Sequence, residues 1–250
     1  MSLSAPQSHN RFSGASARGG GVWSVELDAA TGMLSAGALA GGGSACRSRE
    51  RFCWARDNAA FRNLANHPCV AGSGACDPKY DGENSLEASY LYNFDRVTAA
   101  TGVGHTSSSS VVAAVAARPY FLFVNYYWCC RGDASTYEIR VGRAAAPTGP
   151  FYDRAGADMA EGGGTLVVGN LTLAADGHTR LVGPGHAGIL WDAASRSYAF
   201  TFDFQGVTPP GGGPTQQYAT QARALSWDAD GWPVVSPANW FPAAAAKPSF

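Results

Sequence analysis

One glutamate stands at the head of a strongly apolar stretch of the sequence. Glu87 lies between Leu86 and Ala88, and Tyr90 follows in the same run. Partial removal from water favours the neutral form of a carboxyl group, which suits it to donate a proton. A glutamate that faces solvent from the edge of a strand fits the same local sequence. Both interpretations of Glu87, acid catalyst and surface residue, stay open at this level.

A histidine lies between glycines further along the chain. In the segment GPGHAG over Gly183–Gly188, the glycines allow backbone to approach closely, so that a small ligand has room beside the His186 ring. A lone histidine is also commonly a structural residue held by hydrogen bonds. The segment therefore predicts either a ligand-binding imidazole or a structural one.

The segment CCRGDAST over residues 129–136 joins an aromatic run to the next strand-like run. Arg131 can donate paired hydrogen bonds to a hydroxyl or a carboxylate, although an ion pair within a hairpin would use the same side chain. We take Arg131 and Ser135 as candidate substrate-binding residues. A glycine run at Gly162–Thr165 lacks the lysine and the helix of a phosphate-binding loop, so it predicts a tight turn.

The elements that would position these residues are short strands. The chain has 31 Gly and 14 Pro among 250 residues, which is typical of many tight turns, and no trustworthy amphipathic helical period is visible. Strand-like runs alternate with turn signals. We expect strands over Val22–Leu27, Ala88–Phe94, Tyr120–Tyr127, Tyr137–Gly142, Thr165–Val168, Gly188–Trp191, Tyr198–Asp203 and Ala222–Trp227. The predicted fold class is all-β.

Composition changes suggest where this strand-rich body begins and ends. We predict a disordered or poorly packed segment over 1–20, the body over 21–242, and a C-terminal tail over 243–250. Two ranges look inserted: 45–84 is polar and cysteine-bearing, and 97–118 holds a serine run beside an Ala/Val run. Both are expected to be irregular.

Charge argues against some partners. The net charge is −1 and only 15% of residues are charged, which offers no electrostatic footprint for nucleic acid or an anionic membrane. No apolar stretch is long enough to span a bilayer, and residues 1–21 lack the apolar core of a secretory signal. A neutral polymer such as a polysaccharide suits this charge balance better as a partner. We expect the protein to be a monomer.

The cysteines and one sequon favour an oxidising compartment. The pairs Cys46/Cys53 and Cys69/Cys76 each enclose six residues, a spacing that is not typical of zinc sites, so disulfides and unpaired thiols both remain open. Asn170-Leu171-Thr172 is a glycosylation sequon. We therefore predict a secreted protein or one of the secretory pathway.

The motifs occur in an order that resembles the arabinanase-like branch of glycoside hydrolase family 43, over about residues 12–235. The block from Cys129 to Arg143 is long and specific. The matching blocks are Gly21–Trp23 with Leu27, Asp28, Thr31 and Gly32, then Ser85–Ala88, Cys129–Gly132, Ser135–Arg143, Thr148–Phe151 with Asp153, Gly162–Thr165, Gly185–Gly188 and Asp230–Pro233.

The resemblance implies a five-bladed β-propeller, of which this chain would hold about three four-stranded blades. It implies hydrolysis of α-1,5-L-arabinan with inversion at the anomeric carbon, by two aspartates and a glutamate at the propeller axis. Glu87 matches the general acid, although Ser89 stands where the family motif has proline. His186 matches a histidine that coordinates a cation, Ca²⁺ or Na⁺, at the axis.

The two family aspartates have no counterpart in this sequence. The first aspartate, Asp28, matches a turn residue, and about two N-terminal blades are expected to be absent. Loss of a general base commonly costs about 10²–10⁴-fold in rate. Two alternatives to an active arabinanase therefore remain: a propeller that binds carbohydrate without hydrolysing it, and a fragment whose open sheet edges prevent stable folding.

Overall fold

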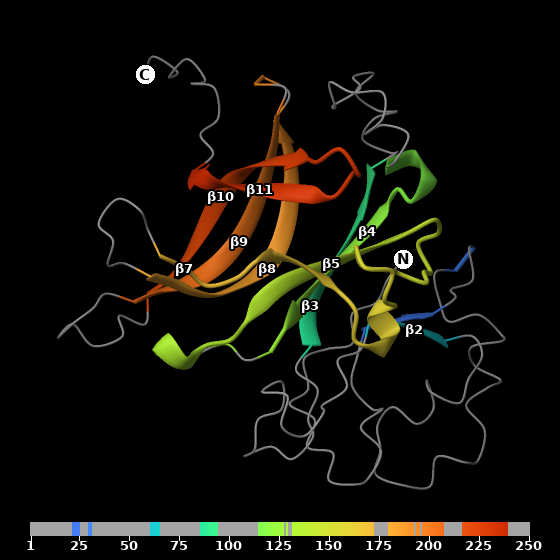
Figure 1. Cartoon of the computed structure of the whole chain (residues 1–250), viewed down its shortest axis with the longest axis horizontal. Helices are drawn as coiled ribbons and strands as arrows, with labels where there is room; N and C mark the ends of the chain where they lie inside the picture. Colours follow the sequence, from blue (N-terminus) through green and yellow to red (C-terminus); the bar gives the residue numbers. More distant parts are fainter. Residues whose placement is uncertain are drawn as a thin grey trace, which may run out of the picture.

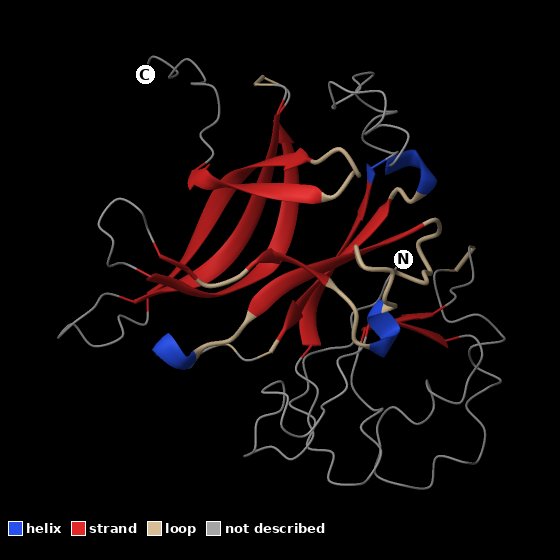
Figure 2. Cartoon of the chain, viewed as in Figure 1, coloured by secondary structure: helices blue, strands red, loops and turns tan. Residues whose placement is uncertain are grey.

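The computed structural model describes residues 22–25, 30–31, 61–65, 86–94, 115–127, 129, 132–172, 180–192, 194–195, 197–207 and 217–239. Across these ranges the chain is built from antiparallel strands with a few short helical turns (Figures 1 and 2). The predicted all-β class is confirmed. In the part of the chain described, no helix is both long and apolar enough to cross a membrane.

The described strands form three sheets. A small sheet pairs β1 with β2, a second has the order β3-β4-β5-β6, and a third has the order β11-β10-β9-β8-β7. We call the second the Glu87 sheet and the third the His186 sheet. The elements are β1 Val22–Val25, β2 Phe61–Ala65, β3 Leu86–Asn93, β4 Tyr120–Tyr126, η1 Gly132–Ala134, β5 Glu138–Ala144, η2 Met159–Glu161, β6 Thr165–Val168, β7 Leu171–Thr172, β8 Arg180–Asp192, β9 Ser197–Val207, β10 Gln217–Trp227 and β11 Pro233–Asn239.

Strand β4 is buried on both faces, which explains its nearly continuous apolar sequence YFLFVNY. Leu122, Val124 and Tyr126 form one face and pack with Leu64 of β2. Phe121 and Phe123 form the other and join the core shared with the His186 sheet. The strand therefore ties the small sheet to the larger core.

Aromatic rings make up most of the contact between the two large sheets, which lie side by side (Figure 1). The rings of Phe123 on β4 and Phe200 on β9 have centroids 5.5 Å apart. Phe94, just after β3, meets Trp227 of β10 edge to face at 4.9 Å. Buried rings contribute large apolar areas and directional contacts, so this layer fixes how the sheets are docked.

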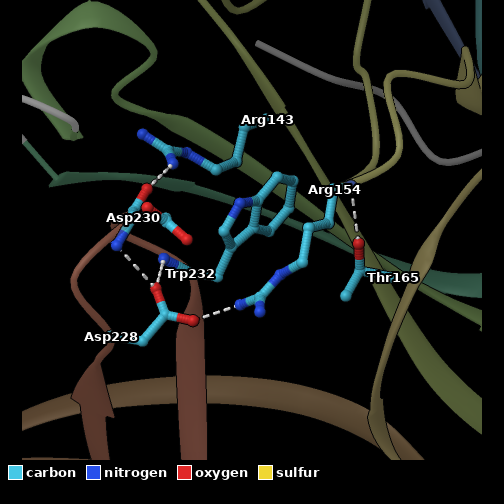
Figure 3. Close-up of polar contacts among 6 residues, drawn as sticks. All are labelled: Arg143, Arg154, Thr165, Asp228, Asp230 and Trp232. Atoms are coloured by element: carbon cyan, nitrogen blue, oxygen red, sulfur yellow. Dashed lines mark hydrogen bonds and ion pairs between the residues drawn. The ribbon is translucent and has the colours of Figure 1, made fainter.

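A second junction centres on a buried arginine (Figure 3). Arg143 of β5 is 4% exposed and lies between the rings of Phe121 and Trp232, 5.1 and 5.2 Å from their centroids. Its Nη1 donates a hydrogen bond to the Asp230 carbonyl oxygen at 2.8 Å. Burial, together with neighbouring Arg118, lowers the pKa of Arg143 to about 10, so the guanidinium is still charged at neutral pH.

The Asp228 carboxylate organises the turn between β10 and β11, next to the Arg143 junction (Figure 3). Asp228 Oδ1 accepts hydrogen bonds from the backbone N–H groups of Asp230 at 3.0 Å and Trp232 at 2.9 Å. Asp228 Oδ2 accepts one from the Arg154 guanidinium. An aspartate that bonds backbone two residues on is a common way to fix a tight turn. Asp228 thereby holds Trp232 where Arg143 can pack on it.

Asp228→Asn is expected to make the protein less sensitive to acid. Burial acts to raise the pKa of Asp228, but hydrogen bonds from the Trp232 N–H and Arg154 outweigh it and lower the pKa from its ordinary value of 3.8. A carboxyl with a lowered folded-state pKa stabilises the fold above its unfolded value and loses that contribution as pH falls below it. Urea unfolding at pH 7 and below about pH 4 should therefore differ less for the variant than for the unmodified chain.

Asp230→Asn is the control for this experiment, because Asp230 accepts the hydrogen bond from Arg143 with its backbone carbonyl and not with its carboxylate. That variant should keep the acid sensitivity of the unmodified chain. Equal pH dependence in all three proteins would show that the Asp228 carboxylate does not stabilise the turn.

Three strands lie where the sequence predicted none. Phe61–Ala65 forms β2 inside the range 45–84 that was expected to be an irregular insertion, Leu171–Thr172 forms the short β7, and Pro233–Asn239 forms β11. Strand β8 starts at Arg180, eight residues before the expected Gly188, because its glycine-rich stretch forms bulges within the strand. Within the range 97–118, Val115 is buried at 1% exposure. The predicted segments 1–20 and 243–250 lie outside the described residues.

Candidate active site

The backbone is irregular directly at Glu87. Glu87 pairs with Asn125 of β4, and the register then shifts before Tyr90, which pairs with Phe123. Ala88 has φ 49°, a left-handed conformation that costs a non-glycine residue about 1–2 kcal/mol. Bulges of this kind redirect side chains and are frequent next to active sites. The predicted acid thus lies on a strand that is locally distorted around it.

His186 also lies on a bulged strand. The pairing of β8 with β9 shifts on both sides of Gly185, and His186 has φ 56°. Its side chain is 55% exposed, with Nδ1 3.8 Å from Oδ2 of Asp203 on β9. Asp203 Oδ1 accepts a hydrogen bond from Thr220 Oγ1 of β10 at 2.6 Å. The His186 sheet therefore presents an imidazole and a carboxylate together at an accessible position.

The register of the Glu87 sheet brings a second set of side chains to Glu87. Directly opposed residues of antiparallel strands point to the same face, so Glu87 and Asn125 are neighbours. Asn125 is also opposite Ile139 of β5, and Tyr137 precedes Ile139 by two residues. Tyr137 therefore shares that face, because side chains alternate along an extended chain.

Strand β8 covers this face with a glycine. A Cβ atom placed on Gly185 would lie 2.2 Å from Asn125 Nδ2 and 2.4 Å from Tyr137 Cε1. Only a residue without a side chain fits there. The close approach joins the two bulges: Glu87, Asn125 and Tyr137 lie on one side of the contact, and Gly185 with the adjacent His186 lies on the other. The structure thus brings together the two strands that the motifs had singled out.

The polar groups under Gly185 are buried. Asn125 is 0% exposed and Tyr137 is 3% exposed. Neither the Asn125 amide nor the Tyr137 hydroxyl forms a hydrogen bond of normal geometry with another protein group. Burial raises the pKa of Tyr137, and the Glu87 carboxylate nearby raises it further. Tyr137 therefore stays protonated and can act as a hydrogen-bond donor.

The two predicted substrate-binding residues have different outcomes. Ser135 is 2% exposed; its N–H donates to the Gly132 carbonyl at 3.0 Å, and its side chain packs on Gly183 of β8. Contact between Ser135 and a substrate stays a prediction. Arg131 lies outside the described residues.

The sequon residue Asn170 takes part in positioning this region. Its Nδ2 donates to the Ser135 carbonyl at 2.8 Å, and its Oδ1 accepts from the Gly183 N–H at 2.9 Å. One side chain thus ties the segment before β5 to the bulged part of β8.

The described residues do not by themselves make a calcium site. Calcium takes about six to eight oxygen ligands, whereas His186 and Asp203 supply one imidazole and one carboxylate. Within the described ranges no cluster of three or more His, Cys, Asp or Glu side chains could hold a metal. We therefore derive no chemical step through a cation.

Sequence reasoning missed Asn125, Tyr137 and Gly185 as parts of the site. Asn125 carried a usable signal, because it is the one amide within the buried run YFLFVNY. Tyr137 had been noted only as the start of a strand, and Gly185 only as a neighbour of His186. Their proximity depends on strand register, which the sequence does not display.

Gly185→Ala is expected to lower the free energy of unfolding by about 1–3 kcal/mol, because overpacking of a filled core forces side chains or backbone to move. The new methyl group would overlap Asn125 and Tyr137. Gly169→Ala is the matched control, since a Cβ there would meet only Leu166, at 3.7 Å. Chemical denaturation of both variants measures the difference. Equal stabilities would contradict the close contact between β8 and the Glu87 sheet.

Comparison with curated proteins finds that the chain is similar to parts of α-(1→5)-L-arabinofuranosidases and arabinanases. It is 34% identical over 119 residues to an extracellular exo-α-(1→5)-L-arabinofuranosidase of Cellvibrio japonicus, covering 46% of this chain and 29% of that protein. It is 48% identical over 48 residues to the extracellular endo-α-(1→5)-L-arabinanase 1 of Bacillus subtilis, covering 19% of this chain and 15% of that protein. No family model matches the chain.

Comparison with solved structures agrees on the fold. The endo-1,5-α-L-arabinanase of Thermotoga petrophila superposes with a TM-score of 0.52 at 20% identity, over 91% of this chain and 39% of that one. The resemblance to arabinanases predicted from the motifs is confirmed, for part of the relatives' length. The chain spans less than half the length of the curated relatives it matches.

Proposed function

We propose that the protein containing this chain hydrolyses α-1,5-L-arabinan and that Glu87 is its general acid. One observation carries the proposal: Glu87 lies on a bulged strand, beside buried polar groups, where β3 meets the His186-bearing bulge of β8. The named relatives act on α-(1→5)-L-arabinose polymers or their ends, which supports the substrate class. Bulges redirect side chains, so two bulged strands that meet at one contact are suited to presenting side chains to a ligand.

The proposed chemistry is hydrolysis with inversion. Glu87 gives its proton to the oxygen of the scissile glycosidic bond, so that the departing sugar leaves as a neutral alcohol. A second carboxylate on the opposite face takes a proton from water, which attacks the anomeric carbon. The two carboxyl groups of such enzymes lie about 6.5–9.5 Å apart. No aspartate of this sequence matches that base, which is left unassigned.

We further propose that the two large sheets are neighbouring blades of a five-bladed propeller. The Glu87 sheet has four antiparallel strands and the His186 sheet has five, counting the short β7. Strands β3 and β8 are in contact, as expected if they lie nearest the axis of neighbouring blades. Side chains from different blades converge at such an axis, which would place Glu87 and His186 at one site.

The test is an assay of the full-length product of the gene on debranched arabinan. Release of reducing sugar is expected, and the product should first appear as the anomer opposite to the substrate linkage, which NMR of a fresh reaction detects. Absence of release would overturn the proposed activity, whereas release with retained configuration would overturn only the inverting mechanism.

A second candidate function is carbohydrate binding without hydrolysis. The missing match for the base aspartate and the serine at position 89 favour it. Binding of arabino-oligosaccharide that persists in Glu87→Gln, with no turnover in either protein, would support this candidate. Turnover that disappears in the variant would eliminate it.

A bound Ca²⁺ or Na⁺ ion near His186 stays a prediction. If the ion binds, calcium should raise the melting temperature of the unmodified protein but not of His186→Ala, because a ligand of the folded state stabilises it by mass action. An equal response of both proteins would contradict a site at His186.

Secretion and a monomeric state are likewise proposals; the extracellular relatives and the disulfide at Cys129 support secretion.

A further inference from the structure

Two buried polar side chains in the core between the large sheets form no protein hydrogen bond of normal geometry. Asn125 is fully buried and Tyr137 is 3% exposed, and neither the Asn125 amide atoms nor the Tyr137 hydroxyl meets a partner at normal hydrogen-bond geometry. The polar neighbours of the hydroxyl are Glu87 and Asn125. Leaving a buried donor or acceptor unpaired costs about 1–3 kcal/mol for each group. Native proteins satisfy more than about nine tenths of such groups, so each exception calls for a specific explanation.

The nearest polar group that the register supplies is the Glu87 carboxyl. Glu87 is directly opposite Asn125, and Cβ atoms of directly opposed residues lie about 4.5–5.5 Å apart. Tyr137 directly precedes β5 and is the diagonal neighbour of Asn125, and its hydroxyl interacts electrostatically with Glu87. The other side is closed by the backbone of Gly185. The amide and the hydroxyl therefore face a space that the Glu87 side chain can enter.

We propose that Asn125 and Tyr137 are positioning residues that hold the Glu87 carboxyl in its proton-donating orientation by donating hydrogen bonds to it. This inference rests on the proposed function of Glu87. Neither residue exchanges a proton with the sugar. The hydroxyl and amide N–H groups hold one carboxyl oxygen, and the other oxygen carries the proton toward the glycosidic bond. The bulge after Glu87, with Ala88 at φ 49°, sets the direction from which the carboxyl reaches them.

The positioning role predicts a selective kinetic effect. In the full-length gene product, Tyr137→Phe and Asn125→Leu should each lower kcat/KM on arabinan by about 10–100-fold, because each removes a hydrogen bond to the carboxylate charge that develops as Glu87 gives up its proton. An arabinoside with a dinitrophenyl leaving group needs no proton to depart. On that substrate, both variants should stay within about threefold of the unmodified enzyme.

Tyr92→Phe is the matched control. Tyr92 lies on the same strand as Glu87 and is 7% exposed, but the neighbours of its buried hydroxyl are Tyr90 and Tyr198 rather than Glu87. This variant should leave the ratio between the two substrates unchanged. A selective loss in Tyr137→Phe with none in Tyr92→Phe would support the proposal.

Equal losses on both substrates in Tyr137→Phe would overturn the positioning role, because a merely structural effect does not depend on the leaving group. An unchanged rate on arabinan would overturn it as well. Tyr137→Phe decides the outcome even if Asn125→Leu does not fold, since the phenylalanine ring fills the same space. If the unmodified gene product fails to hydrolyse arabinan, the proposed function falls first, and this inference falls with it.

Discussion

Glu87→Gln is expected to slow the hydrolysis of arabinan by about 10²–10⁴-fold, the usual contribution of general acid–base catalysis. The amide keeps the shape of the side chain but has no proton to give to the departing sugar. On an arabinoside with a dinitrophenyl leaving group, the same variant should retain most of its activity, because that group departs as a stable anion. Steady-state kinetics on both substrates, in the full-length gene product, measure the two effects.

The contrast between the substrates separates a catalytic glutamate from a surface one. Glu138→Gln is a suitable control, because Glu138 on β5 pairs with Arg140 through a bond of 2.6 Å and takes no part in the proposed chemistry. Comparable losses on both substrates would identify Glu87 as a structural residue. An unchanged rate on arabinan would show that Glu87 is a solvent-facing surface residue, the alternative that the local sequence also allowed.

Arg143→Ala is expected to lower the free energy of unfolding by about 3 kcal/mol or more. The change empties a core position and removes a charged donor, and these two losses typically cost about 2–5 and 1.5–3 kcal/mol, not fully additively. Arg143 contacts the rings of Phe121 and Trp232 and donates to the Asp230 carbonyl, so one side chain joins β5 to the β10–β11 turn (Figure 3). Urea denaturation with comparison of midpoints and slopes measures the loss.

Arg154→Ala tests whether the effect comes from burial rather than from charge. Arg154 also lies near the Trp232 ring and pairs with Asp228, but its side chain is 50% exposed. Exposed ion pairs contribute about 0–1 kcal/mol. Equal destabilisation by the two substitutions would show that the junction depends on the ion pair and not on the buried guanidinium.

The sequence predicted the type of fold and the two strands that carry the site. Strands such as Tyr120–Tyr126 could be predicted because burial on both faces leaves a continuous apolar run. Glu87 and His186 could be singled out because an acidic residue in an apolar run and an imidazole among glycines are unusual locally. These features depend on neighbours along the chain.

Features that depend on distant parts of the chain could not be predicted. The contact of Asn125 with Tyr137 and Gly185 requires the register of β3, β4 and β5 and the bulges of β8. A shift of one residue in any pairing would turn these side chains to the opposite face. Strand β2 could not be predicted for the same reason: its partner β1 lies about forty residues away, and the sequence there has weak periodicity.

The aromatic layer between the two large sheets also provides a spectroscopic signal for the docking of one sheet on the other. The Trp227 ring centroid lies 4.9 Å from that of Phe94, which directly follows β3, and 4.9 Å from that of Tyr198 in its own sheet. The Trp191 and Tyr198 centroids are 4.8 Å apart. Closely spaced rings held in a fixed asymmetric arrangement give a strong near-ultraviolet circular dichroism signal, which disappears when packing loosens while strands persist. Separation of the sheets will therefore be visible as a spectral change before the strands themselves unfold.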